Sequence, residues 1–155
     1  MPEDTPGFDH RIGGGSVPAL DSDITLTLPA RPENIALVRH MIGALGAAIQ
    51  LPEATVDDMR LAVTEACTNV VRHAYSEADG RIEVVIRPDG EAINVIVSDD
   101  GRGLGSSPDV SGPGLGLSLI AALADRLEID HAPRRGSRLL MAFRRRRGPH
   151  PVGAV

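Results

Sequence analysis

Hydrophobic and polar residues follow two periodicities along this chain. Residues 24–28 alternate between the two kinds, which is typical of a half-buried strand. From residue 32 to residue 50, the apolar side chains recur three and four positions apart. That spacing predicts an amphipathic helix, with Pro32 in its first turn and Pro52 marking the break after it.

A second helix is predicted from about residue 56 to residue 74, because Thr55 followed by Asp58 resembles a capping box at its start. Next come two alternating strands joined by a Pro-Asp-Gly turn, a third helix after a glycine-dense loop, and a closing strand after an Arg-Arg-Gly turn. The predicted ranges of these four elements are 81–87, 92–98, 115–126 and 138–144.

The order strand, helix, helix, strand, strand, helix, strand predicts an α+β sandwich, with the helices packed on one face of a mostly antiparallel mixed sheet. A chain of 155 residues with 42% hydrophobic residues is expected to hold one domain with a real core. We place this domain at residues 23–145. Residues 1–22 are rich in proline and glycine and predict a flexible leader, and residues 146–155 predict a basic, flexible tail.

Charge and composition narrow the classes of function. A formal net charge of -5 and an aromatic content of 2% argue against direct nucleic-acid binding, which favours a basic face and stacking aromatic rings. The single cysteine, Cys67, excludes an intramolecular disulfide and fits a reducing compartment. No apolar run approaches the length of a membrane span, and the first residues lack a signal-peptide pattern. We therefore expect a cytoplasmic protein that makes no membrane contact.

Three polar residues lie four positions apart in the apolar run of the second helix: Glu65, Asn69 and His73. Side chains at this spacing stack on one face of a helix, so the stripe is either a solvated edge or one wall of a site. For His73 both interpretations stay open, because an imidazole near a helix C-terminus is also favoured by the helix dipole.

Glycine groups occur at three places where predicted elements begin or end. DDGRG (99–103) comes directly after a strand, GPGLG (112–116) directly before a helix, and GS (136–137) before the last strand. Glycine lets a ligand approach the backbone closely, and a helix N-terminus favours phosphate. The first two groups match neither the P-loop nor the G-x-G-x-x-G pattern, and the H-R-D and D-F-G kinase signatures are absent.

Taken in order, these motifs resemble the N, G1 and G2 boxes of the GHKL ATPase superfamily: Glu65-x-x-x-Asn69, Asp99-x-Gly101-x-Gly103 and Gly112-x-Gly114-x-Gly116. The superfamily covers histidine-kinase catalytic domains, gyrase-type ATPases, Hsp90-like chaperones and MutL-like repair proteins. Within it, the phrase EACTNVVRHAY (65–75) is similar to the anti-sigma-factor serine/threonine kinases. The resemblance spans roughly residues 23–143 and implies a Bergerat-type ATP-binding fold.

The resemblance also implies ATP and Mg²⁺ as cofactors and gives an expected role to each residue. Asn69 is expected to offer an oxygen to Mg²⁺, and Glu65 to accept the proton of an attacking hydroxyl. Asp99 is expected to accept a hydrogen bond from the adenine amino group. The further residues expected to contact the nucleotide are His73, Gly101, Gly103, Gly112, Gly114, Leu115, Gly116, Leu117 and Ser137.

The function implied by the resemblance is that of a protein serine/threonine kinase, which moves the ATP γ-phosphoryl group to a STAS-type anti-anti-sigma protein. The same protein is expected to bind a sigma factor, to hold it away from RNA polymerase, and to form a homodimer. An alternative is a binding module that uses nucleotide only to sequester a regulatory protein, which the presence of Glu65 disfavours. The catalytic half of a two-component histidine kinase is disfavoured too, because residues 1–22 are too few for a helical hairpin with a phospho-accepting histidine.

Overall fold

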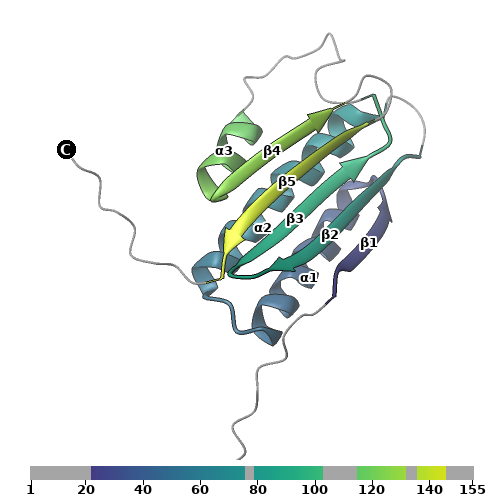
Figure 1. Cartoon of the computed structure of the whole chain (residues 1–155). Coiled ribbons are helices and arrows are strands. Elements are labelled where there is room, and N and C mark those ends of the chain that lie inside the picture. Colours follow the sequence, from purple (N-terminus) through teal and green to yellow (C-terminus); the bar gives the residue numbers. More distant parts are fainter. Residues whose placement is uncertain (1–21, 76–78, 103–114, 132–135, 146–155) are drawn as a thin grey trace, which may run out of the picture.

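The computed structural model of the protein describes residues 22–75, 79–102, 115–131 and 136–145 (Figure 1). Most of the predicted leader and the whole predicted tail lie outside these ranges, so both stay predictions. Along the chain the elements are β1 (Ile24–Pro29), α1 (Pro32–Ala48), α2 (Glu53–Asn69), the π-helical turn η1 (Val70–Ala74), β2 (Arg81–Asp89), β3 (Ala92–Asp99), α3 (Leu115–Leu123), β4 (Arg126–His131) and β5 (Ser137–Arg144).

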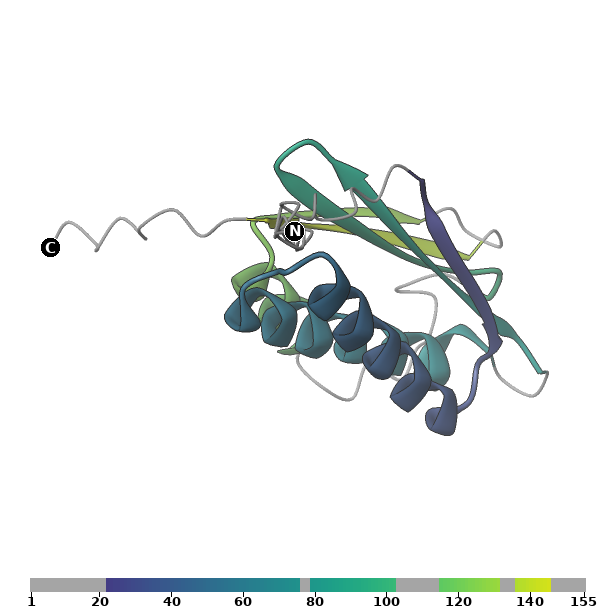
Figure 2. The same ribbon diagram turned by 90° about the horizontal axis from the view of Figure 1, so that it is seen from below.

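In the described part of the chain, five strands form one sheet in the order β1-β2-β3-β5-β4, and their four pairings are all antiparallel. The helices cover one face of the sheet, with α2 packed between α1 and α3 (Figure 2). The predicted α+β sandwich is confirmed, but the described sheet is antiparallel throughout and not mixed, because each strand pairs only with strands that run against it. None of the helices described here combines the length and the apolar character needed to cross a bilayer.

The core lies between the helices and the sheet and is almost entirely aliphatic. Residues of β2 alternate between buried and exposed, because one face of the strand packs on the helices and the other meets solvent. Fully burying a large apolar side chain contributes roughly 1.5–3 kcal/mol, so this packing holds α2 in a fixed orientation. The largest fully buried side chains come from both layers and include Ile42, Met59, Ile86, Ile93, Ile120, Met141 and Phe143.

The second helix begins earlier than predicted. It starts at Glu53 with Pro52 at the N-cap position, and no side chain caps this end. Thr55, the predicted cap, lies inside the first turn, and its Oγ1 is buried without a hydrogen-bond partner in the described part of the chain. Pro52 accounts for the shift, because its fixed φ and missing N–H suit the start of a helix. The capping-box prediction is therefore wrong.

The predicted order of elements lacked one strand, β4. This strand follows α3 almost directly and forms an edge of the sheet beside β5, because α3 ends at Leu123 rather than near residue 126. Its sequence RLEIDH does alternate, but a run this short is hard to tell from a loop. The hairpin between β2 and β3 also turns later than predicted, since Asp89 pairs with Ala92.

Candidate functional site

Glu65 and Asn69 lie on the edge of α2 that faces the first turn of α3, and both are half-buried. A Cβ placed at Gly116, the second residue of α3, would lie 3.3 Å from Glu65 Oε2 and 3.4 Å from Asn69 Oδ1. The two oxygens therefore lie near the same point of the α3 backbone. This end of α3 therefore brings backbone N–H groups, for which the helix itself provides no acceptor, close to both side chains.

Asp99 is buried at the end of β3, with 6% of its surface exposed. The Ser137 hydroxyl donates a hydrogen bond to Asp99 Oδ2, and the Gly101 N–H donates one to Oδ1 at 2.8 Å. The first contact follows from the strand register, because Asp99 and Ser137 are direct partners in the β3–β5 pairing. Each carboxylate oxygen keeps a second lone pair, so Asp99 can still accept a hydrogen bond from a ligand.

Two glycines beside Asp99 are required by close backbone contacts. A Cβ at Gly101 would overlap the Ala74 carbonyl. Gly136 has a φ of 83°, and a Cβ there would overlap the Asp99 carbonyl. Only glycine fits such positions without displacing the neighbouring backbone. The chain thus brings the end of η1, the end of β3 and the start of β5 into direct backbone contact.

Four of the predicted site residues line one small cavity between α2, η1, β3 and β5: Asn69, His73, Asp99 and Ser137. His73 is exposed and lies at the rim of this cavity, so the structure places it at the site but does not assign it a chemical role. The rest of the cavity wall is apolar and consists of Ala66, Val70, Ala74 and Leu139. The cavity itself is only about 10 Å³, so its relevance lies in bringing these polar side chains together on an apolar wall.

The π-helical turn η1 is the part of the site that the sequence patterns did not predict. It follows Asn69 directly and ends at Ala74, whose carbonyl accepts a hydrogen bond from the Arg102 N–H at 2.9 Å. Single π-turns are rare and occur frequently at functional sites. Nothing in the run VVRHA separates a π-turn from an α-turn, so periodicity alone could not have found it.

The profile of the family described as Histidine kinase-like ATPase domain matches residues 28–143. This chain belongs to that family. It is similar to the serine-protein kinase RsbW of Bacillus cereus strain Q1, with 32% identity over 123 residues that cover 70% of this chain and 77% of the relative. The RsbW of Bacillus anthracis is also 32% identical, with the same coverage of both chains. The predicted membership of the anti-sigma-factor kinase family is confirmed.

Two solved structures share the fold of this histidine-kinase-like ATPase. One is the crystal structure of the RsbU and RsbW domains of Rv1364c from Mycobacterium tuberculosis, with a TM-score of 0.64 and 24% identity, covering 79% of this chain and 32% of that one. The other is a histidine kinase domain from the Erythrobacter litoralis EL346 blue-light activated histidine kinase, with a TM-score of 0.53 and 21% identity, covering 76% of this chain and 61% of that one. At these identities the likeness concerns the fold alone.

The second glycine box of this ATPase is described only at its end. Gly112 and Gly114 of this box lie outside the described residues, as does Gly103 of the first glycine box. The contacts predicted between these three glycines and the nucleotide stay predictions. Leu115 begins α3 and is 68% exposed, whereas Leu117 is half-buried against the core. Of the two leucines, Leu115 is thus the one whose side chain is open to a ligand or partner.

The side chains at this site fit a Mg²⁺–nucleotide complex better than a metal held by protein alone. In the parts of the chain that the structure describes, no three His, Cys, Asp or Glu side chains form a group that could hold a metal ion. Asn69 offers a carboxamide oxygen and Glu65 a carboxylate oxygen near one point. Mg²⁺ commonly takes one or two protein oxygens and completes its shell with water and substrate phosphates, which matches this donor set.

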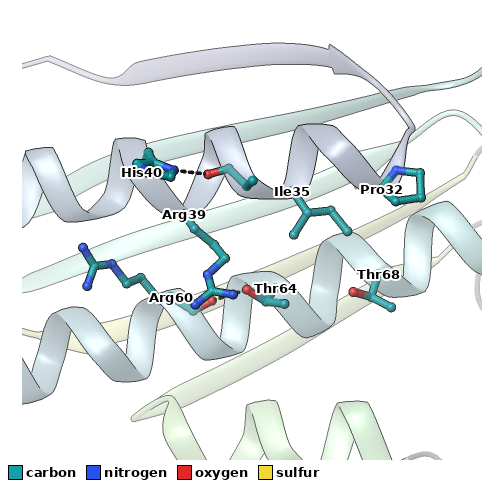
Figure 3. Close-up of a pocket in the computed structure, with 8 residues that line it drawn as sticks. Pro32, Ile35, Arg39, His40, Arg60, Thr64 and Thr68 are labelled. Atoms are coloured by element: carbon teal, nitrogen blue, oxygen red, sulfur yellow. Dashed lines mark hydrogen bonds between the residues drawn. The ribbon is translucent and has the colours of Figure 1, made fainter.

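A larger groove, of about 510 Å³, lies on the other side of α2, between α1 and α2 (Figure 3). Arg39, Arg60, Thr64 and Thr68 are among the residues that line it. The Thr64 hydroxyl already donates to the Arg60 carbonyl at 2.7 Å, and Arg60 pairs with Asp57 at 3.5 Å. Because the groove contains no predicted site residue and no buried polar group, its size alone does not make it the active site.

Proposed function

We propose that this protein is an ATP-dependent serine/threonine kinase that phosphorylates a STAS-type anti-anti-sigma protein and also sequesters a sigma factor. One observation carries the proposal. Glu65 and Asn69 face the first turn of α3, and Asn69 shares a cavity with the buried carboxylate of Asp99. A base and a neutral ligand for a hard cation, both from α2, and an acceptor for a purine amino group, from β3, thus come from two segments to one region.

Each side chain has a chemical task in this proposal. ATP, when bound with Mg²⁺, supplies the γ-phosphoryl group and the neutralisation of its charge. Asn69 holds the cation through its carboxamide oxygen, and Asp99 accepts a hydrogen bond from the adenine amino group through a free lone pair. Glu65 accepts the proton of the substrate hydroxyl while the hydroxyl oxygen attacks the γ-phosphorus, the bond from that phosphorus to the β–γ bridging oxygen breaks, and ADP leaves. Ser137 keeps the Asp99 carboxylate oriented by its hydrogen bond.

The partners in this proposal are supported by the family and by the charge of the chain. The relatives are named serine-protein kinases, which supports a protein hydroxyl as the acceptor. The net charge of -5 supports partners other than nucleic acid.

We also propose a cytoplasmic site of action without membrane contact, and a homodimer. Among the strands that the structure describes, β1 is at one edge of the sheet and pairs only with β2, and an edge strand can pair with a second copy.

The test is phosphoryl transfer from γ-labelled ATP, with Mg²⁺, to the STAS-type proteins of the same genome. We expect Glu65→Gln to lower the transfer rate about 10²–10⁴-fold, because the proton acceptor is lost, while ATP binding stays within about threefold. The matched control is Glu53→Gln, the same change in the exposed first turn of the same helix. This control should transfer label at the wild-type rate.

Two outcomes would contradict the proposal. Normal transfer by Glu65→Gln would remove Glu65 as the base. Tight ATP binding by the wild-type protein, with no transfer to any STAS-type protein of the genome, would instead support a module that uses nucleotide only to sequester a partner.

A further inference from the structure

The Tyr75 hydroxyl joins three segments of the chain beside the candidate adenine site. It donates a hydrogen bond to the Arg81 carbonyl at 2.7 Å and accepts the Arg81 N–H at 3.1 Å. It also accepts the Asp100 N–H at 3.0 Å. A phenol has one proton to donate and two lone pairs, so these three bonds use its whole capacity.

The contact with Asp100 concerns the site, because Asp100 follows Asp99 in the loop after β3. Three consecutive N–H groups of this loop are hydrogen-bonded. The Asp100 N–H binds Tyr75, the Gly101 N–H binds the Asp99 carboxylate, and the Arg102 N–H binds the Ala74 carbonyl. Two of these three acceptors, on Ala74 and Tyr75, lie where η1 ends, at the C-terminal end of the helix that α2 begins. The direction in which the chain leaves Asp99 is therefore set by this helix end.

Two glycines leave space for Ala74 and Tyr75, the two residues at this helix end. A Cβ at Gly80 would overlap the ring of Tyr75, and a Cβ at Gly101 would overlap Ala74. Tyr75 is half-buried, so the ring is held by packing as well as by its hydroxyl. Glycines at these positions allow the helix end to seat against β2 and against the loop after β3 at the same time.

We propose that Tyr75 is a positioning residue for nucleotide recognition, whose hydroxyl fixes the backbone that presents the Asp99 carboxylate to the adenine base. The inference rests on the proposed function, because it takes Asp99 as the group that reads adenine. Tyr75 acts through the Asp100 amide, and it connects the helix that carries Glu65 and Asn69 to the end of β3, which carries Asp99.

The test compares Tyr75→Phe with the wild-type protein, since phenylalanine keeps the ring and removes only the hydroxyl. We expect ATP affinity, measured by calorimetry, to fall about three- to tenfold, which corresponds to the net contribution of one hydrogen bond, the one that the Asp100 N–H donates to Tyr75. The preference for ATP over GTP should fall with it. Amide hydrogen exchange without nucleotide should become faster at Asp100 and at Arg81, whose N–H groups bind the hydroxyl, while the amides paired within the sheet in β2 and β3 keep their protection.

The control variant is Asn34→Ala, which removes a side-chain hydrogen bond of 2.8 Å to the Pro29 carbonyl on another side of the fold. It should change the preference for ATP over GTP in no measurable way, even where it lowers the melting temperature. Unchanged affinity and selectivity in Tyr75→Phe, or equal losses for ATP and GTP, would overturn the inference and leave the proposed function standing. A wild-type protein that binds no adenine nucleotide would overturn both.

Discussion

Asp99 shows how much of the site is organised at the scale of single residues. Both oxygens of its carboxylate already accept a hydrogen bond, from Ser137 and from the Gly101 N–H. A buried polar group is stable only when it is hydrogen-bonded, so these two donors keep the carboxylate in place at the end of β3. A ligand donor would therefore meet an acceptor whose direction is already set.

Asp99→Asn tests whether this acceptor reads the base. The change keeps the shape but turns one acceptor oxygen into an NH₂ group, which cannot accept from Ser137, from Gly101 or from adenine. We expect ATP affinity to fall at least about tenfold and discrimination between ATP and GTP to be largely lost. Calorimetric titration of both nucleotides measures this. The neighbouring exposed carboxylate gives the control, Asp100→Asn, which should bind as the wild type does. Full adenine selectivity in Asp99→Asn would contradict the assignment.

At the scale of elements, the sequence predicted best where the periodic signal is long. The α1 and α2 helices and the β2–β3 hairpin follow their hydrophobic spacing, and the face of α2 that carries Glu65 and Asn69 follows from their spacing of four. The strand β4 was missed because its alternation is short. The π-turn η1 and the contacts of Tyr75 could not be predicted, because they depend on which distant backbone groups the folded chain brings together.

The junction of β3 and β5 depends on Gly136, and two glycines in the chain allow a controlled test. Gly136 and Gly90 both have positive φ, but a Cβ at Gly136 would overlap the Asp99 carbonyl, while a Cβ at Gly90 meets nothing within 4 Å. Gly90→Ala should cost only the backbone strain, about 1–2 kcal/mol. Gly136→Ala should cost more and should also weaken ATP binding, because the strand end must move. Urea unfolding and calorimetry measure the two effects. Equal costs with unchanged binding would contradict the role given to this junction.

At the scale of the whole molecule, the alkaline titration of this protein is unusually simple. All 16 basic side chains are arginines, so no lysine loses its proton between pH 8 and pH 11. The chain also holds a single cysteine, Cys67, whose thiol ordinarily has a pKa near 9. Cys67 is fully buried in the core beside the N box, and this burial raises its pKa to about 12.

The stability of the fold should therefore fall with rising pH through Cys67. Its pKa is higher in the folded state than in the unfolded state, so above about pH 9 the unfolded chain loses the thiol proton while the folded one keeps it. The free energy of unfolding should drop by about 1.4 kcal/mol between pH 8 and pH 10 from this group, and the loss should continue toward pH 12. Urea unfolding at several pH values, compared with Cys67→Ala, isolates the effect, because the two proteins differ only in this side chain. If the free energy of unfolding falls with pH as steeply in the alanine variant as in the wild type, the buried thiol does not set the alkaline limit of this fold.

A second measurement tests the burial of Cys67 itself. Its thiol should react slowly with a thiol reagent in the native protein and fast in urea.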